Sequence, residues 1–541
     1  MKKNQLLVLV FTIFSFSVFA QKDAKVKVTW GGEYFLPKKH VDLGFIGNEK
    51  EGYVQIGHLK GKSLSIQRFD NTYKVKSEKI IPLKNLPKDY SSEQLLEFNG
   101  KYYWFFSTYE RKDGVERLFV QEIDVVKGDF AGGARELLNS KIKLTGTLVS
   151  GGWYNFSTMG KWKISTTLDG KSKLLVQYRV RPAEKKDKIN KDVIGLFVFD
   201  ENVNKIGGKE QVMPYTEAEM DNEDYYVDNQ GNVMLLAKVH KLEEKTKDKK
   251  KADYHFEILK WGLNDAQAQI IPFKFEDKFV SEVVIAEDNN HVPLVVGYYS
   301  KKKRGGSADG LFVLKVNANG NSLENVFKGT YEFPSDVLKQ FESARSQRKI
   351  DKKEGKDDNE VGSLRFKDLT IGPDGSLFVT GEQYWVTVQI IQTKYGVQYR
   401  YTHHYDDIYT AKIGADGELK YVTKIPKTQV TTNGFSYWVG GMSFKNYTYN
   451  GKQYFLFIDN MKNLAITPGT APAAHVDGFG GILMMIGIDD AGKTAKAKLF
   501  DFREEKRQLK VTNFNKVSNN QLITRTFGKK NVSKPFILTF E

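Results

Sequence analysis

Turns of Asn, Asp and Gly recur eight times along this chain, and each precedes a short apolar stretch with the composition of a β-strand. Asn-Gly and Asp-Gly pairs adopt the positive φ that tight hairpins need, so each turn marks a corner between two strands. The stretches begin 49 to 85 residues apart, which is too far for one hairpin and suits a four-stranded unit with loops. They span 53–59, 102–109, 173–179, 233–239, 292–299, 377–384, 453–458 and 522–527.

A second strand-like stretch follows the first in every unit, and most units add another after a further polar turn. This pattern predicts an all-β fold, a single β-propeller of eight blades, with seven blades as the alternative. The last unit stops at Glu541 without an outer strand. Residues 25–30 (KVKVTW) have the composition to supply it, so we expect the N- and C-terminal strands to pair and close the ring. The 27 tyrosines and 36 phenylalanines suit packed sheets.

The first twenty residues have the composition of a secretory signal peptide. Lys2 and Lys3 precede an apolar stretch at 6–19, and small residues stand before Gln21. The expected organisation is a signal peptide at 1–20 and a propeller domain at 21–541, exported to the periplasm, the periplasmic face of the outer membrane or the cell surface. The apolar stretch is short for a membrane anchor, and no transmembrane segment is expected after signal cleavage. The chain has no cysteine, which excludes disulfides and thiolate metal sites.

Long insertions are expected on one face of the propeller. They follow the second strand of several units, at 180–193, 240–253, 300–309, 385–407 and 459–480. In a four-stranded blade these loops open on the same face as the connections between blades, and the tight turns open on the other. The segment 334–361 belongs to the decorated face and is predicted to be partly helical, from Pro334 to about Lys353. A rigid scaffold decorated on one side indicates an interaction surface, and neutral loop growth is the alternative.

Basic residues are concentrated in three of these insertions, in a chain of net charge +16. The run at 301–304 contains no acidic residue and is the candidate for binding phosphate or carboxylate, whereas the other two runs carry compensating acids. An acidic glycan, lipopolysaccharide or an acidic protein surface would suit an exported protein. Nucleic acid is not expected, because no aromatic residues interleave with the basic ones. The candidate residues are Lys301, Lys302, Lys303 and Arg304.

The insertion at 385–407 is predicted to form an extended hairpin that turns near Tyr395 and Gly396. Its arms are rich in apolar and aromatic residues, which need to be covered by neighbours or by a partner protein. Adjacent residues on a strand point to opposite faces, so His403, His404 and the two following aspartates are not expected to form one metal or acid–base site. The candidate binding residues here are Trp385, Tyr395, Tyr399, Tyr401, His403 and His404.

The stretch GPDGSLFVTGEQY, beginning at Gly372, resembles the turn-and-strand repeats of WD-like and NHL-like propellers. Over its length the chain is similar to exported propeller proteins of Bacteroidota-type bacteria. The resemblance implies a fold and a compartment. It supplies no catalytic residues, because the Asp-box runs of sialidases, the tryptophan-docking repeats of quinoprotein dehydrogenases and regular Trp-Asp strand ends are absent.

Two functions remain open. The first is a non-enzymatic interaction protein, a subunit or accessory of an outer-membrane transport or secretion assembly, with an envelope protein as partner and no cofactor or metal. The second is a carbohydrate-binding or carbohydrate-active propeller, which would need carboxyl groups about 5 to 10 Å apart at the channel mouth. Calcium binding at Asp221, Glu223 and Asp224 is a weaker possibility, because the spacing matches no calcium loop. The carboxylates considered for the channel mouth are Asp42, Asp221, Asp224, Asp277 and Asp368.

Overall fold

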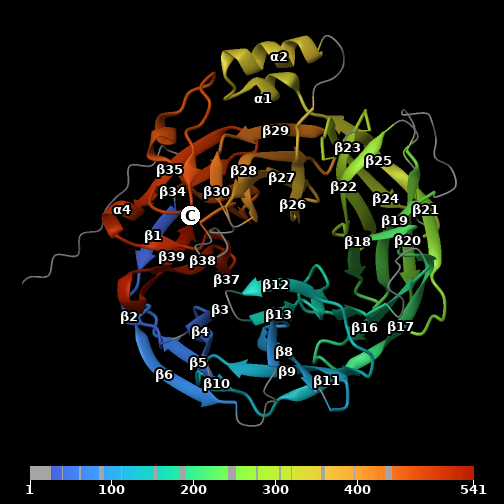
Figure 1. Ribbon diagram of the computed structural model, residues 1–541, viewed down its shortest axis with the longest axis vertical. Coiled ribbons are helices and arrows are strands. Elements are labelled where there is room, and N and C mark those ends of the chain that lie inside the picture. Colours follow the sequence, from blue (N-terminus) through green and yellow to red (C-terminus); the bar gives the residue numbers. More distant parts are fainter. Residues whose placement is uncertain are drawn as a thin grey trace, which may run out of the picture.

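The computed structural model consists almost entirely of β-strands, which confirms the predicted propeller class. In the part of the chain it describes, eight sheets of four to six strands follow one another in sequence order and are arranged as a ring (Figure 1). The structure describes residues 26–541 except 39, 60–62, 84–89, 111, 152–154, 183–188, 242–251, 274, 276–277, 304–305, 318–319, 355–359, 395 and 433–440, with the backbone only at 147–151, 155–159 and 325–328.

We number the sheets 1 to 8 along the chain. Neighbouring strands are antiparallel except for β30 and β33. Sheet 1 contains β3 (His40–Asn48), β4 (Gly52–Leu59), β5 (Ser63–Phe69) and β6 (Val75–Pro82). Sheet 2 contains β7 (Tyr90–Phe98), β8 (Lys101–Glu110), β9 (Val115–Asp124), β10 (Asp129–Phe130) and β11 (Arg135–Ser140). Sheet 3 contains β14 (Lys163–Thr166), β15 (Leu174–Arg179), β16 (Lys191–Phe199) and β17 (Lys205–Thr216). Sheet 4 contains β18 (Met220–Val227), β19 (Val233–His240), β20 (Tyr254–Trp261) and β21 (Gln269–Phe273).

The second half of the chain repeats this plan. Sheet 5 contains β22 (Phe279–Glu287), β23 (Pro293–Ser300), β24 (Gly310–Val316) and β25 (Leu323–Glu332). Sheet 6 contains β26 (Leu364–Ile371), β27 (Leu377–Thr393), β28 (Gly396–Ile413), β29 (Leu419–Ile425), β30 (Gln429–Thr432) and β33 (His475–Val476). Sheet 7 contains β31 (Lys445–Tyr449), β32 (Lys452–Asp459), β34 (Ile482–Ile488) and β35 (Thr494–Asp501). Sheet 8 contains β36 (Gln508–Leu509), β37 (Asn515–Ser518), β38 (Gln521–Phe527), β39 (Val532–Phe540), β1 (Val26–Trp30) and β2 (Tyr34–Phe35).

The core lies between the sheets. Each sheet buries an apolar face against the next one, and the described side chains form eight such clusters, one for every pair of successive sheets. The cluster between sheets 8 and 1 contains Ile523 and Ile537 on one side and Phe45 and Phe69 on the other. Burial of both faces explains why the second and third strands of a sheet are almost continuously apolar.

The two chain ends share sheet 8. β1 pairs antiparallel with β39, from Val26 opposite Phe540 to Trp30 opposite Phe536. This is the strand that the sequence predicted at 25–30. The ring of Trp30 lies 4.9 Å from that of Phe536 and 5.1 Å from that of Phe500, so the N-terminal strand is held by packing as well as by the backbone ladder.

A bulge recurs in the innermost strands of sheets 4, 5 and 6, and the residue after it bonds to the next sheet. Asp224 accepts a hydrogen bond from the backbone N–H of Ile285 at 3.0 Å. Glu282 accepts one from the guanidinium of Arg365 at 2.6 Å, and Asp368 accepts one from the amide of Asn446. The inner edges of sheets 4 to 7 are therefore joined by polar contacts as well as by the apolar clusters.

The tight turns lie on one face of the ring, which we call the turn face. One type of turn recurs on this face. The aspartate at its start accepts hydrogen bonds from the backbone N–H groups of the residues two and four positions later. Asp228, for example, accepts from Gln230 at 2.9 Å and Asn232 at 2.8 Å. The fourth residue of the turn has positive φ, which Gly231 adopts without strain. The same turn begins at Asp70, Asp200, Asp288 and Asp489.

The opposite face, which we call the loop face, carries the long insertions. The single helix expected from Pro334 to about Lys353 is in fact two helices, because the chain breaks at Gln340 and Phe341 adopts a positive φ of 58°. Both helices lie at the rim of the ring, outside sheet 6 (Figure 1). None of the described helices is long and apolar enough to span a membrane. The elements outside the sheets are α1 (Ser335–Lys339), α2 (Ala344–Glu354), α4 (Phe502–Glu505), the 3-10 helices η2 (Met461–Ala465), η3 (Val511–Asn513) and η4 (Lys529–Asn531), and the hairpin β12 (Thr147–Gly151) with β13 (Asn155–Met159).

The packing of β1 leads to a stability prediction. We expect Trp30→Ala to lower the free energy of unfolding by about 2 kcal/mol, because it removes a partly buried aromatic ring between sheets 7 and 8. The matched control is Lys27→Ala, an exposed position on the same strand, which should change stability by less than about 0.5 kcal/mol. Urea unfolding of both variants measures the difference. Equal stability of the two variants would contradict the structural role of β1.

Candidate functional site

The most distinctive feature of the loop face is the hairpin formed by β27 and β28. These strands have 17 and 18 residues, about twice the length of most strands in the other sheets. β26 pairs with β27 only as far as Gln383, and β30 pairs with β28 only from Thr402. Among the described residues, the outer parts of β27 and β28 pair only with each other. We call this outer part, together with the stretch of β28 at 402–405 that also pairs with β30, the projecting hairpin (384–405).

One face of the projecting hairpin is mainly apolar, and the other is more polar although it also carries Trp385 and Ile391. Cross-strand pairs such as Val388 with Tyr401 and Ile390 with Tyr399 point to one side, and Gln389 with Arg400 points to the other. The exposed fraction is 66% for Ile390 and 56% for Tyr399, so the apolar side is uncovered. The apolar face consists of Val386, Val388, Ile390, Val397, Tyr399 and Tyr401.

The local sequence explains this shape. β-Branched and aromatic residues dominate both arms and favour extended backbone. Most of them alternate with Thr, Gln and Arg, which gives the period of two expected of a strand with one mainly apolar side, and the adjacent Ile390 and Ile391 are an exception. Thr393 pairs with Gly396, whose φ of 117° is readily adopted by glycine, so the turn lies where the sequence predicted it.

The structure separates the binding residues that the sequence had grouped on this hairpin. Tyr399 and Tyr401 lie on the apolar face. Trp385 lies on the opposite face, where its ring stacks on that of His404 at 4.9 Å. His403 lies on the apolar side and its Nδ1 is 2.9 Å from the hydroxyl of Tyr384. The two histidines therefore point in opposite directions, as predicted, and Tyr395 lies outside the described residues.

Three valines of the apolar face were missed by the sequence interpretation, which selected aromatic residues. All three share a face with the tyrosines. Val397 lies two residues from Tyr399, Val388 lies opposite Tyr401, and Val386 lies two residues from Val388 on the same strand. The period of two along each arm, read together with the position of the turn, was the signal that could have identified them, and it would also have placed Trp385 on the other face.

The basic run at 301–304 is partly neutralised. Lys301 forms an ion pair with Glu332 at 2.8 Å, and Lys303 forms one with Asp253 at 3.0 Å. Lys302 also has polar contacts, and Arg304 lies outside the described residues. Anion binding by this run stays a prediction. The basic residues at 183–188 and 242–251 lie outside the described part of the chain.

A buried charged cluster lies beneath the projecting hairpin. Glu382 on β27 is fully buried and forms ion pairs with Lys427 at 2.8 Å and Lys367 at 3.0 Å. Its other partner is the hydroxyl of Ser443 at 2.8 Å. Burial alone would raise the pKa of Glu382, but the two ammonium groups outweigh this effect and lower it. The carboxylate is therefore charged in the folded protein.

A second set of ion pairs ties the helical insertion to the same place. Lys424, at the end of β29, binds Glu342 from the connection between α1 and α2 at 2.7 Å and Asp407 of β28 at 3.1 Å. The side chain of Lys424 is 1% exposed. Because breaking a buried ion pair is strongly destabilising, these contacts fix the base of the hairpin relative to sheet 6 and the helices.

The loop at 460–480 packs beside the hairpin as an ordered segment. Its β33 pairs with β30, which in turn pairs with β28. Asp459 begins the loop and accepts a hydrogen bond from the amide of Asn463 at 2.7 Å. Burial raises the pKa of Asp459 to about 6 and lowers that of His475 to about 4. The hairpin is thus supported on both sides of its base.

The carboxylates considered for a catalytic pair each have a different local partner. Asp42 forms an ion pair with Arg525 at 2.9 Å, and Asp221 is 2.7 Å from His240. Asp224 and Asp368 take part in the contacts between sheets described above, and Asp277 lies outside the described residues. Within the described part of the chain no group of three or more potential ligands could hold a metal ion, and the calcium site considered at 221–224 is not formed.

No protein-family model and no curated protein matches the sequence. Similar solved structures include the β-propeller domain of the Trilobed protease from Pyrococcus furiosus, with 11% identity over 71% of this chain and 98% of that one and a TM-score of 0.31. A protein of unknown function from Dyadobacter fermentans has 7% identity over 70% and 94% of the two chains and a TM-score of 0.29. The α-L-arabinanase of Penicillium chrysogenum has 11% identity over 65% and 93% and a TM-score of 0.28. Likeness at this level assigns no activity.

The charged cluster leads to a prediction about pH. Burial raises the pKa of Asp406 to about 7, and the neighbouring Asp407 adds to the effect. An unfolded aspartate titrates near 3.9, so the folded protein binds the extra proton between these values and becomes less stable as the pH rises from about 4 to 7. We expect Asp406→Asn to remove this dependence and to raise the free energy of unfolding at pH 8 by roughly 1 kcal/mol. This is less than the pKa difference alone would give, because Asp406 is partly exposed and solvent screens its charge.

Urea unfolding at pH 5 and pH 8 measures this effect. Asp407→Asn is the contrasting variant, because it removes a charge that pairs with Lys424 and should destabilise the protein at pH 8. An Asp406→Asn variant with the same pH dependence as the wild type would show that this carboxyl is ionised throughout the range.

Proposed function

We propose that this protein is an exported, non-enzymatic interaction protein that presents the projecting hairpin to a partner protein. The observation that carries the proposal is the exposed apolar face of six side chains on a hairpin whose base is fixed by buried ion pairs. Apolar surface of this kind is costly in water unless a partner covers it. Envelope proteins are the partners to expect if residues 1–20 direct export.

The edges of the hairpin, beside which the described structure places no further strand, favour a protein as partner. Between Gln383 and Thr402 the outer edges of β27 and β28 have no strand beside them in the described structure. Free backbone N–H and C=O groups accept an added strand, and the alternating side chains give such an addition its specificity. The partner is therefore one that supplies an extended segment to pair with the edge, together with apolar side chains to cover the adjoining face.

The apolar face can be removed while the strand is kept. The variant Val388→Thr, Ile390→Thr and Tyr399→Thr retains residues that favour β-structure. Tagged protein is recovered from the detergent-solubilised envelope of its own organism, and the co-purifying proteins are identified by mass spectrometry. We expect at least a tenfold loss of a stoichiometric partner, which is then purified so that its affinity for each variant can be measured directly.

The matched control carries the same new residue on the polar face, as Gln389→Thr, Gln398→Thr and Arg400→Thr. It should retain the partner, and both variants should keep the melting temperature of the wild type. Equal binding by the two variants would refute the role of the apolar face. Light scattering of the purified wild type and of both variants tests whether the partner is a second copy of this chain. A homodimer that only the apolar-face variant disrupts would show that it is.

A further inference from the structure

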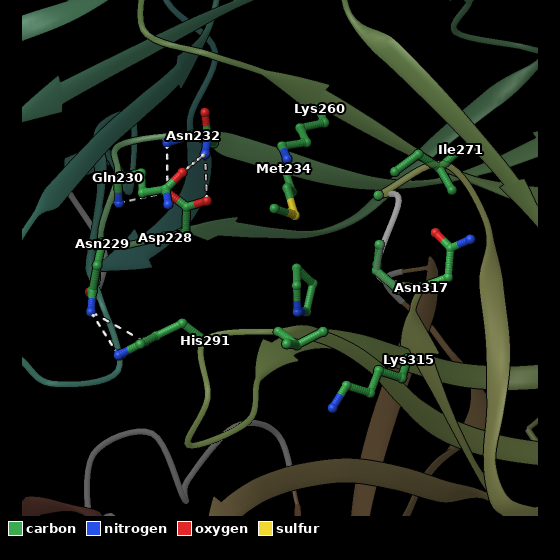
Figure 2. A pocket seen from close by; sticks show the side chains of 14 residues that line it. Asp228, Asn229, Gln230, Asn232, Met234, Lys260, Ile271, His291, Lys315 and Asn317 are labelled. Carbon is green, nitrogen blue, oxygen red and sulfur yellow. Dashed lines mark hydrogen bonds between the residues drawn. The ribbon is translucent and has the colours of Figure 1, made fainter.

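A cavity of about 520 Å³ opens on the turn face, between sheets 4 and 5 and away from the projecting hairpin. Its walls come from the turn that links β18 to β19, the turn that links β22 to β23, and the ends of β20, β21 and β24 (Figure 2). Its volume is in the range of binding sites for small molecules. The proposed function makes no use of this cavity.

The cavity combines an apolar wall with side-chain amides. Met234 and Ile271 provide the apolar part together with Pro293, and the amides of Asn229 and Gln230 border it (Figure 2). The amide of Asn317 also lies at the cavity but is held by its own turn, where it donates to Asn321 at 3.0 Å. An amide both donates and accepts hydrogen bonds, so it suits neighbouring hydroxyl groups, and an apolar wall suits the C–H face of a sugar ring. This combination favours a ligand with several hydroxyl groups and one apolar side.

One positive charge in the cavity is not neutralised. Lys315 forms an ion pair with Asp288 at 2.7 Å. Asp228 is occupied by the amide of Asn232 at 2.7 Å and by backbone N–H groups of its turn. Lys260 is partly buried, and its ammonium group has no ion pair among the described residues. A ligand with one negative charge would therefore pair with Lys260 and complete the site. An amino acid fits less well, because its ammonium group would need a carboxylate of the protein and both aspartates named here are already occupied.

The rim of the cavity is held in a strained conformation. His291 has a φ of 62°, at the turn position that Gly231 and Gly375 occupy in neighbouring sheets and that Tyr73 and Val203 occupy, also at positive φ, in sheets 1 and 3. A side chain at positive φ costs free energy and is retained where the surrounding structure holds it. Here the imidazole lies 3.2 Å from the amide of Asn229 and 3.3 Å from the buried carboxylate of Glu287, so it bridges sheets 4 and 5 at the opening.

We infer that this cavity binds a carboxylated sugar. Its carboxylate would form an ion pair with Lys260, its hydroxyl groups would form hydrogen bonds with the side-chain amides, and its ring would pack against Met234 and Ile271. The cavity is separate from the projecting hairpin. A variant that loses the protein partner is therefore expected to keep sugar binding, and a variant that loses sugar binding is expected to keep the partner. A uronic acid is the simplest ligand of this class.

Isothermal titration calorimetry tests the inference with D-glucuronate, D-glucose and inorganic phosphate as probes. We expect glucuronate to bind with a Kd in the millimolar range or tighter, and glucose and phosphate to bind at least tenfold more weakly. Lys260→Met keeps the length of the side chain and removes the charge, and it should weaken glucuronate binding at least tenfold. The matched control is Lys171→Met, an exposed lysine on a turn of sheet 3, which should bind like the wild type.

Melting temperatures without ligand establish that both variants are folded. Equal binding of glucose and glucuronate would overturn the role assigned to Lys260, and so would unchanged binding by Lys260→Met. Phosphate binding more tightly than glucuronate would overturn the carboxylate assignment. No binding of any probe by the wild type would overturn the site itself.

Discussion

The burial of each sheet against the next is the interaction on which the rest of this structure depends. Every sheet has two apolar faces, and each face is covered only when a neighbouring sheet lies beside it. The cluster between sheets 8 and 1, with Phe45 facing Ile537, covers the two faces that an open row of sheets would leave exposed. Because packing of this kind leaves little freedom between sheets, the strand ends from which the described loops and turns extend are held at fixed positions on both faces of the ring.

This rigidity makes the projecting hairpin effective as a binding element. A two-stranded hairpin is marginally stable alone, and this one continues strands that are already fixed in sheet 6. The ion pairs of Glu382 and Lys424 join its base to β26, to β29 and to the helices outside the sheet. An apolar face presented in this way loses little conformational freedom when a partner covers it, which favours binding.

Much of the fold could be predicted from the sequence, because turns and strands depend on near neighbours. The Asn, Asp and Gly turns marked the first corner of each sheet, and 25–30 was identified as the strand that completes the last one. The break at Gln340 between α1 and α2 was not predicted, since the polar, helix-favouring residues on both sides suggested continuity. On the hairpin, the position of the turn was predicted correctly. The choice of faces was not, because aromatic character was given more weight than alternation, and Trp385 was grouped with Tyr399 although they point in opposite directions.

The sequence by itself determined the strands, the tight turns and the amphipathic character of 384–405, because each of these depends on backbone preferences and on the period of two along a strand. Only the tertiary structure decided which charges meet. Lys424 and Glu342 are 82 residues apart, and their pairing depends on how the helical insertion folds back over sheet 6. The cavity beside Lys260 likewise exists because sheets 4 and 5 pack against each other and bring their turns together. No local pattern records this arrangement, since it follows from the fit of side chains across an interface.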